Sequence, residues 1–103
     1  MRVRVSLRRP AERDLDEALD WYLGTAPEYA AAFLDEVGQV IQRIGRSPLL
    51  FRQVHGEVRR AALRRYPYFV WFVVEGETAH VIAISHKRQD PETVGARIET
   101  WTE

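Results

Sequence analysis

The stretch ISHKRQDP, residues 84–91, ends an apolar segment with three side chains that can carry positive charge. His86 has a reference pKa of about 6.5, so it can take up or release a proton near neutral pH. Lys87 and Arg88 follow it and can hold an anion. Metal-free cleavage of RNA needs a base, an acid and cations for the charge that develops at phosphorus. This stretch is therefore the first candidate site.

A second group of candidate side chains lies between residues 59 and 66, where four arginines are followed by a tyrosine. The arginines could hold a phosphate, and Tyr66 or Tyr68 could stack on a base. If the protein cleaves RNA, its candidate catalytic residues are Arg59, Arg60, Arg65, Tyr66, His86 and Arg88. Arginines and tyrosines are also ordinary on an exposed sheet face, so a structural role for each is the alternative.

The stretch 84–91 has a structural interpretation as well. Asp90 could cap the last segment, Arg88 could pair with an acid, and His86 could hydrogen-bond at the sheet end. His55 and His80 have no carboxylate or imidazole at ligand spacing in the sequence. We therefore expect no metal site and no cofactor.

Charge is unevenly distributed along the chain, although the formal net charge is zero. Residues 43–65 carry seven basic side chains and only Glu57 as an acid, while residues 1–42 and 75–103 are each net acidic. Fourteen of the fifteen Lys and Arg residues are arginine, which suits phosphates, carboxylates and aromatic faces. A genome rich in G and C would also favour arginine, so composition alone does not select a partner.

The composition predicts one soluble globular domain spanning residues 1–103, with 46% hydrophobic and 29% charged residues. The absence of cysteine excludes disulfides and thiolate metal sites, and indicates a reducing compartment. The apolar run 69–74 is too short to span a bilayer, and the charged start of the chain lacks an apolar signal region. We expect a cytoplasmic protein without membrane contact.

The elements that must position these residues follow from hydrophobic periodicity. The pattern predicts a strand at residues 3–7, two helices at 10–23 and 27–44 that form an antiparallel hairpin, strands at 58–66, 68–74 and 78–86, and a short helix at 92–101. This order indicates an α+β fold in which the last three strands form an antiparallel meander within one antiparallel sheet. The strand 68–74 is apolar on both faces and should be central. One of its faces would hold the helical hairpin, and the other must be covered by something else or exposed to a partner.

This pattern resembles the RelE/ParE superfamily of bacterial toxins over nearly the whole chain. The matching residues occur in the family's order and are Ala11, Asp14, Leu15, Trp21, Tyr22, Pro48, Phe51, Arg52, Arg59, Arg60, Tyr66, Pro67, Tyr68, residues 86–91 and Arg97. The resemblance implies a toxin of a type II toxin–antitoxin system, neutralised by a ParD- or RelB-like antitoxin, with operator DNA contacted only through that antitoxin. It implies DNA gyrase or the ribosome as the target.

The shared fold does not choose between a ParE-like gyrase inhibitor and a RelE-like ribosome-dependent ribonuclease. RelE-like ribonucleases also use lysines near the second strand, and the only lysine here is Lys87. The ending His86-x-Arg88-x-Asp90-Pro91 is more similar to the ParE-like branch, which favours gyrase inhibition. A domain that binds antitoxin but has lost toxicity is a third hypothesis. Residues expected to bind target or antitoxin are Arg52, Arg60, Arg64, Tyr68, Arg88 and Arg97.

Overall fold

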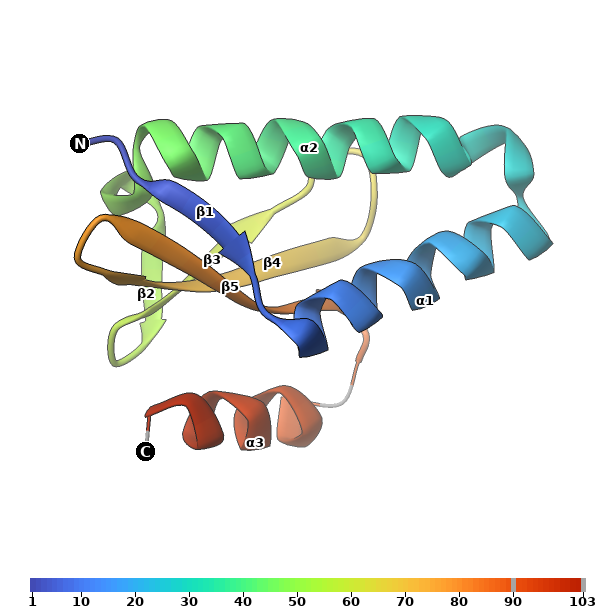
Figure 1. Ribbon diagram of the computed structural model, residues 1–103. Coiled ribbons are helices and arrows are strands. Elements are labelled where there is room, and N and C mark those ends of the chain that lie inside the picture. Colours follow the sequence, from blue (N-terminus) through green and yellow to red (C-terminus); the bar gives the residue numbers. More distant parts are fainter. Residues whose placement is uncertain (90, 103) are drawn as a thin grey trace.

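A five-stranded sheet forms the middle layer of the protein, with two helices on one face and one on the other (Figure 1). The structure is a computed structural model that describes residues 1–89 and 91–102. The elements in chain order are β1 (Arg4–Leu7), α1 (Arg9–Thr25), the 3-10 turn η1 (Pro27–Tyr29), α2 (Ala30–Arg46), the 3-10 turn η2 (Pro48–Leu50), β2 (Arg52–His55), β3 (Val58–Ala62), β4 (Tyr68–Glu75), β5 (Thr78–His86) and α3 (Pro91–Thr102). The predicted α+β fold with its helical hairpin and short C-terminal helix is confirmed.

The sheet order is β1-β5-β4-β3-β2, and this adds two features to the predicted topology. The strands β2 to β5 pair antiparallel, whereas β1 pairs parallel to β5, so the antiparallel sheet carries one parallel edge strand. The edge strand β2 was not predicted. Its four residues are almost all exposed, so they carry no apolar alternation. A turn at Gly56, whose φ of 55° favours glycine, joins β2 to β3.

The larger core lies between the sheet and the helical hairpin. Its fully buried stripe on α2 consists of Phe33, Val37, Val40 and Ile44, as the helical spacing predicts. Of the adjacent Trp21 and Tyr22, Tyr22 is buried in this core and Trp21 is 55% exposed. Adjacent residues of a helix point in different directions, so only Tyr22 of the two faces the sheet.

A smaller core lies on the opposite face, beneath α3. The sheet contributes Val58, Val73 and Ile82, and α3 contributes Val94 and Ile98. β4 contributes Val70 and Phe72 to the larger core and Val73 to the smaller one, so both of its faces are covered, which explains its continuous apolar sequence. None of the helices in the described part of the chain is long and apolar enough to cross a membrane.

Candidate functional site

A groove between β4 and α3 brings aromatic and cationic side chains together in a cavity of about 360 Å³. Cζ of Arg60 lies 4.1 Å from the centre of the Phe69 ring and 5.4 Å from that of Trp71. Nζ of Lys87 lies 5.4 Å from the Phe69 ring centre. These distances are those of cation–π contacts, so the groove has an apolar floor with positive charge at its rim. We name this the aromatic groove; its lining residues are Val54, His55, Arg60, Phe69, Trp71, Ser85, His86, Lys87, Gln89, Val94, Gly95, Ile98 and Glu99.

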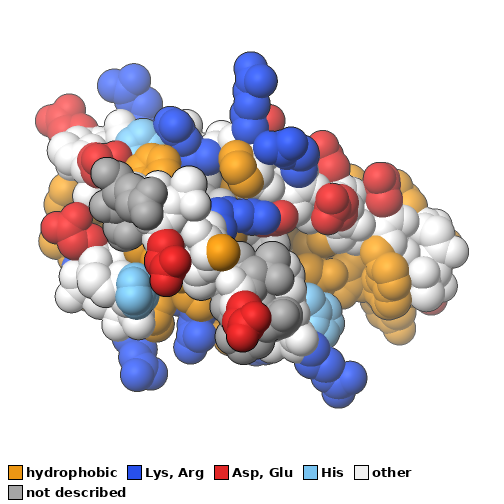
Figure 2. Space-filling view, turned by 90° about the horizontal axis from the view of Figure 1, so that it is seen from below, with side chains coloured by type: hydrophobic (Ala, Val, Ile, Leu, Met, Phe, Trp, Pro, Cys, Tyr) orange, Lys and Arg blue, Asp and Glu red, His pale blue; other side chains and the backbone are white. Residues whose placement is uncertain are grey.

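The strand register explains why these side chains share one face. Arg60 is paired with Trp71 across β3 and β4, and Phe69 lies two residues before Trp71, so all three point toward α3. The indole Nε1 of Trp71 donates a hydrogen bond of 2.8 Å to Oγ of the buried Ser85, which fixes the orientation of the ring. Figure 2 views the protein from the α3 side and shows Lys and Arg side chains projecting around the edge of this face.

His86 lies at the end of β5 and has a structural partner on each side. Its ring is 5.1 Å from that of Tyr68, edge to face, and its Nδ1 accepts a 3.0 Å hydrogen bond from the backbone N–H of Arg88. When neutral, the ring therefore carries its proton on Nε2. The Arg88 side chain is exposed and forms no ion pair among the described residues. The cap predicted for Asp90 lies outside those residues.

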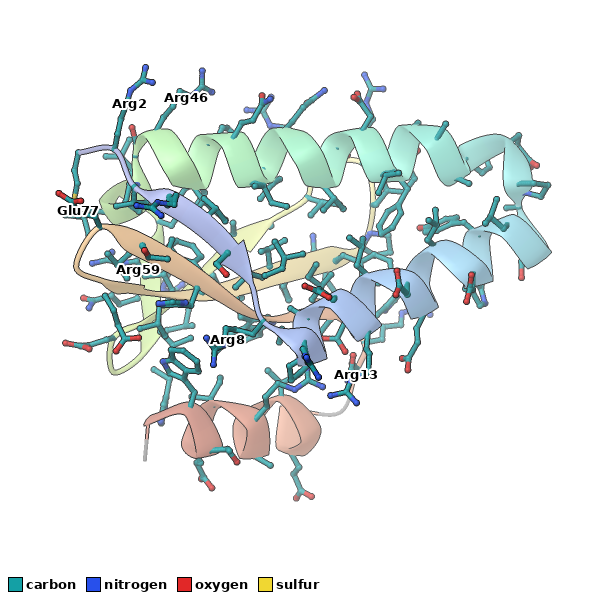
Figure 3. The ribbon with its side chains drawn as sticks, in the orientation of Figure 1. Arg2, Arg8, Arg13, Arg46, Arg59 and Glu77 are labelled. Carbon is teal, nitrogen blue, oxygen red and sulfur yellow. The ribbon has the colours of Figure 1, made fainter. Side chains whose placement is uncertain are left out.

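Arg59 points away from the aromatic groove. Its Nη1 donates hydrogen bonds to the backbone carbonyls of Phe51 at 2.6 Å and Leu49 at 3.3 Å. In Figure 3 it lies against the sheet, whereas Arg2 and Arg46 project from the molecule. Arg59 therefore holds the segment that enters β2 through one nitrogen of its guanidinium group.

Tyr66 and Tyr68 belong to an aromatic cluster in the hairpin core. The Tyr66 ring centre lies 5.6 Å from that of Tyr22 and 5.5 Å from that of Phe33, both edge to face. Burial raises the pKa of Tyr68 above its usual value. Burial raises the pKa of Tyr22 as well, with smaller contributions from Tyr68 and Tyr66. These tyrosines pack the core and do not reach the aromatic groove.

Arg64 and Arg65 lie in the bend between β3 and β4, on the side of α2. Glu36 of α2 is buried, and its carboxylate accepts hydrogen bonds from the backbone N–H groups of both arginines. Both arginine side chains are exposed and border a second cavity of about 320 Å³, next to Arg43. The strand predicted for residues 58–66 therefore ends at Ala62, because Glu36 satisfies the backbone of the bend that follows.

The two remaining candidate arginines, Arg97 and Arg52, lie on α3 and β2. Arg97 of α3 forms an ion pair with Asp14 of α1, so it anchors a helix. Arg52 is exposed on the edge strand β2.

His80 proves less isolated than its sequence position indicated. The hairpin of β4 and β5 brings its Nε2 to 3.5 Å from Oε1 of Glu75, and its ring lies 5.4 Å from that of Trp101. A metal site would need further ligands. No group of three or more His, Asp or Glu side chains within residues 1–89 and 91–102 could hold a metal ion.

Of the candidate catalytic residues, Arg60 and His86 line the same cavity, and the others are dispersed around the sheet. Arg60 faces α3, Tyr66 faces the helical hairpin, Arg65 lies beside α2, and Arg59 is bound to backbone carbonyls. The sequence interpretation missed the roles of Phe69, Trp71 and Ser85. These residues lie in strands whose largely apolar sequences are typical of an ordinary core. It also missed Glu36, although its position three residues after Phe33 places a charge on the apolar stripe of α2.

Comparisons with known proteins agree with this architecture. Residues 5–91 match the family model described as the ParE toxin of type II toxin–antitoxin systems. Toxin ParE2 of Mycobacterium tuberculosis is 28% identical over 100 residues, which are 96% of this chain and 95% of that protein.

Two solved structures share the fold. One is from the chromosomal ParDE system of P. aeruginosa, with a TM-score of 0.73 and 22% identity over 82% of this chain and 95% of that chain. The other is from the RelBE2 toxin–antitoxin complex of Mycobacterium tuberculosis, with a TM-score of 0.57 and 18% identity over 84% of this chain and 99% of that chain. With the family model covering most of its length, the chain belongs to the ParE family of type II toxin–antitoxin toxins.

Proposed function

We propose that this toxin inhibits DNA gyrase by binding to it and performs no chemistry of its own. The observation that carries the proposal is the separation of the candidate catalytic groups by the sheet. Arg60 contacts Phe69 on the α3 face, while Tyr66 contacts Phe33 on the hairpin face. Side chains on opposite faces of a sheet point away from each other, so these two cannot act on the same phosphate.

The remaining candidate groups do not form a complete ribonuclease. Cleavage of RNA needs an acid and a base within hydrogen-bond reach of one phosphodiester. His86 is held at Nδ1 by the backbone of Arg88, and Lys87 is the only lysine in the chain. The aromatic groove has the apolar floor and cationic rim of a recognition surface.

The aromatic groove is the surface on which we place the antitoxin. A ParD- or RelB-like segment could lay apolar side chains on Phe69 and Trp71 and acidic ones beside Arg60 and Lys87. The solved structures that share this fold come from a ParDE system and a RelBE2 complex, which supports an antitoxin partner. In this proposal the toxin acts in the cytoplasm and meets operator DNA only through the antitoxin.

Expression of the toxin without antitoxin, in a bacterium that carries a DNA-damage reporter, tests the proposed target. A gyrase poison should arrest growth and induce the reporter strongly, because broken DNA accumulates. Growth arrest with a silent reporter would instead support a ribosome-dependent ribonuclease, with His86 and Arg88 as the first residues to replace. Normal growth together with tight antitoxin binding would support the non-toxic binding module.

A further inference from the structure

Glu36 is a buried charged side chain that binds the backbone of an exposed bend. It lies on the apolar stripe of α2 and is only 9% exposed. Its Oε2 accepts the backbone N–H of Arg64, and its Oε1 accepts that of Arg65 at 3.1 Å. Two successive backbone donors on one carboxylate fix the bend between β3 and β4 in a single conformation.

This bend exposes two arginine side chains that have no ion-pair partner within the described part of the chain. Arg64 and Arg65, whose side chains are exposed, border the same cavity as Arg43 of α2. Within the described part of the chain, none of the three forms an ion pair. Two acids line the same cavity: Glu36 binds the backbone of the bend, and Asp35 accepts a 3.0 Å hydrogen bond from Gln39. The three arginines outnumber these two acids, so the cavity keeps a net positive formal charge. We name Arg43, Arg64 and Arg65 the arginine ledge.

We infer that the arginine ledge binds an acidic surface patch of the toxin's target protein, and that Glu36 is the positioning residue for this contact. The inference rests on the proposed function, since it names the surface through which a binding inhibitor would engage its target. Arginine is suited to this role because its planar fork pairs with carboxylates in a defined geometry. A bend held by Glu36 also orders the backbone beneath the arginines before binding, so less entropy is lost in the complex.

The arginine ledge fits a target better than an antitoxin. An antitoxin must neutralise its toxin by a durable complex, and durable interfaces are more hydrophobic than transient ones. The described side chains around this cavity are mostly polar or charged, whereas the aromatic groove offers Phe69 and Trp71. Glu36 and the aromatic groove belong to opposite faces of the sheet, so the two surfaces can be mutated independently.

The experiment measures binding of purified toxin to purified gyrase and, separately, to its antitoxin. The double variant Arg64→Ala/Arg65→Ala should bind gyrase about tenfold more weakly or worse, and its binding should depend less on salt. Its affinity for antitoxin should be unchanged. The control is Arg46→Ala, which replaces an exposed arginine of α2 that lies outside the arginine ledge. This variant should bind gyrase and antitoxin with wild-type affinity. Wild-type affinity for gyrase in the double variant, or a loss confined to the antitoxin, would overturn the inference.

The test of Glu36 must distinguish a positioning role from a general loss of protein stability. Glu36→Gln keeps the shape of the side chain but can accept only at one oxygen, so it should weaken gyrase binding, though by less than the double variant, which lacks both guanidinium groups. Added to Arg64→Ala/Arg65→Ala, it should cause no further loss, because it acts through these arginines. A full additive loss would overturn the positioning role. Failure of the wild-type toxin to bind gyrase would contradict the proposed function itself.

Discussion

Asp14 of α1 and Arg97 of α3 form an ion pair that joins helices from opposite faces of the sheet. Oδ2 of Asp14 accepts from the Arg97 guanidinium and also accepts the backbone N–H of Ile84 at 2.9 Å. One carboxylate therefore connects α1, β5 and α3. This contact places α3 over the aromatic groove, so the geometry of the groove depends on a residue far away in the sequence.

Replacing Asp14 should destabilise the protein more than replacing Arg97. Asp14→Ala removes the acceptor of a backbone N–H as well as the ion pair, and we expect it to lower the free energy of unfolding by about 2–3 kcal/mol. Arg97→Ala leaves the bond to Ile84 intact and should cost about 1 kcal/mol, since the arginine is partly exposed. Urea unfolding measures both. Arg13→Ala, an exposed arginine of α1, is the control, and equal effects of all three variants would contradict this account.

The aromatic groove should determine antitoxin affinity. Phe69→Ala removes the ring on which Arg60 and Lys87 rest, and we expect antitoxin binding to weaken by about 2 kcal/mol, which is roughly thirtyfold. Trp71→Phe keeps an aromatic ring but loses the hydrogen bond to Ser85, so its effect should be smaller. Isothermal titration of each variant with antitoxin measures the change. Unaltered binding by Phe69→Ala would place the antitoxin elsewhere.

The buried tyrosines predict that stability falls at high pH. Burial raises the pKa of Tyr68 and Tyr22 in the folded protein above the ordinary value of 10.0. Above pH 10 the unfolded chain loses these protons first, so it binds fewer protons than the folded chain and the free energy of unfolding decreases as pH rises. The stabilisation is fully present below pH 10 and is lost as pH rises through the folded-state pKa values.

Urea unfolding between about pH 8 and pH 11 measures this slope, since the range spans the ordinary tyrosine pKa. Tyr68→Phe and Tyr22→Phe should each make the slope less steep, because each removes one group with a raised pKa. A slope that neither substitution changes would assign the alkaline loss of stability to other groups.

Much of this fold follows from local patterns in the sequence. The apolar stripe of α2 and the two-faced apolarity of β4 each indicate their burial directly. The edge strand β2 leaves no such pattern, because three of its four residues face solvent. The parallel pairing of β1 with β5 joins residues 74 positions apart, such as Arg4 and Thr78, and no local period contains that information.

The candidate site was less predictable than the fold. The type of a residue does not indicate which face of the sheet its side chain occupies, and a bend in the backbone can change that face. Arg59 and Arg60 are adjacent, so they must lie on opposite faces of β3, and only Arg60 reaches the aromatic groove. Tyr66 follows the bend that Glu36 holds, and this bend directs its ring into the hairpin core. The partner of that bend is 28 residues away on another element.

A supercoiling assay with purified gyrase and purified toxin tests gyrase inhibition most directly. We predict that the toxin alone reduces supercoiling and causes cleaved plasmid to accumulate, and that prior mixing with the antitoxin prevents both effects. His86→Ala should remain fully active, because the account gives this side chain no catalytic step. Normal supercoiling at toxin concentrations that arrest growth, together with cleavage of ribosome-bound messenger RNA that His86→Ala abolishes, would contradict the central claim.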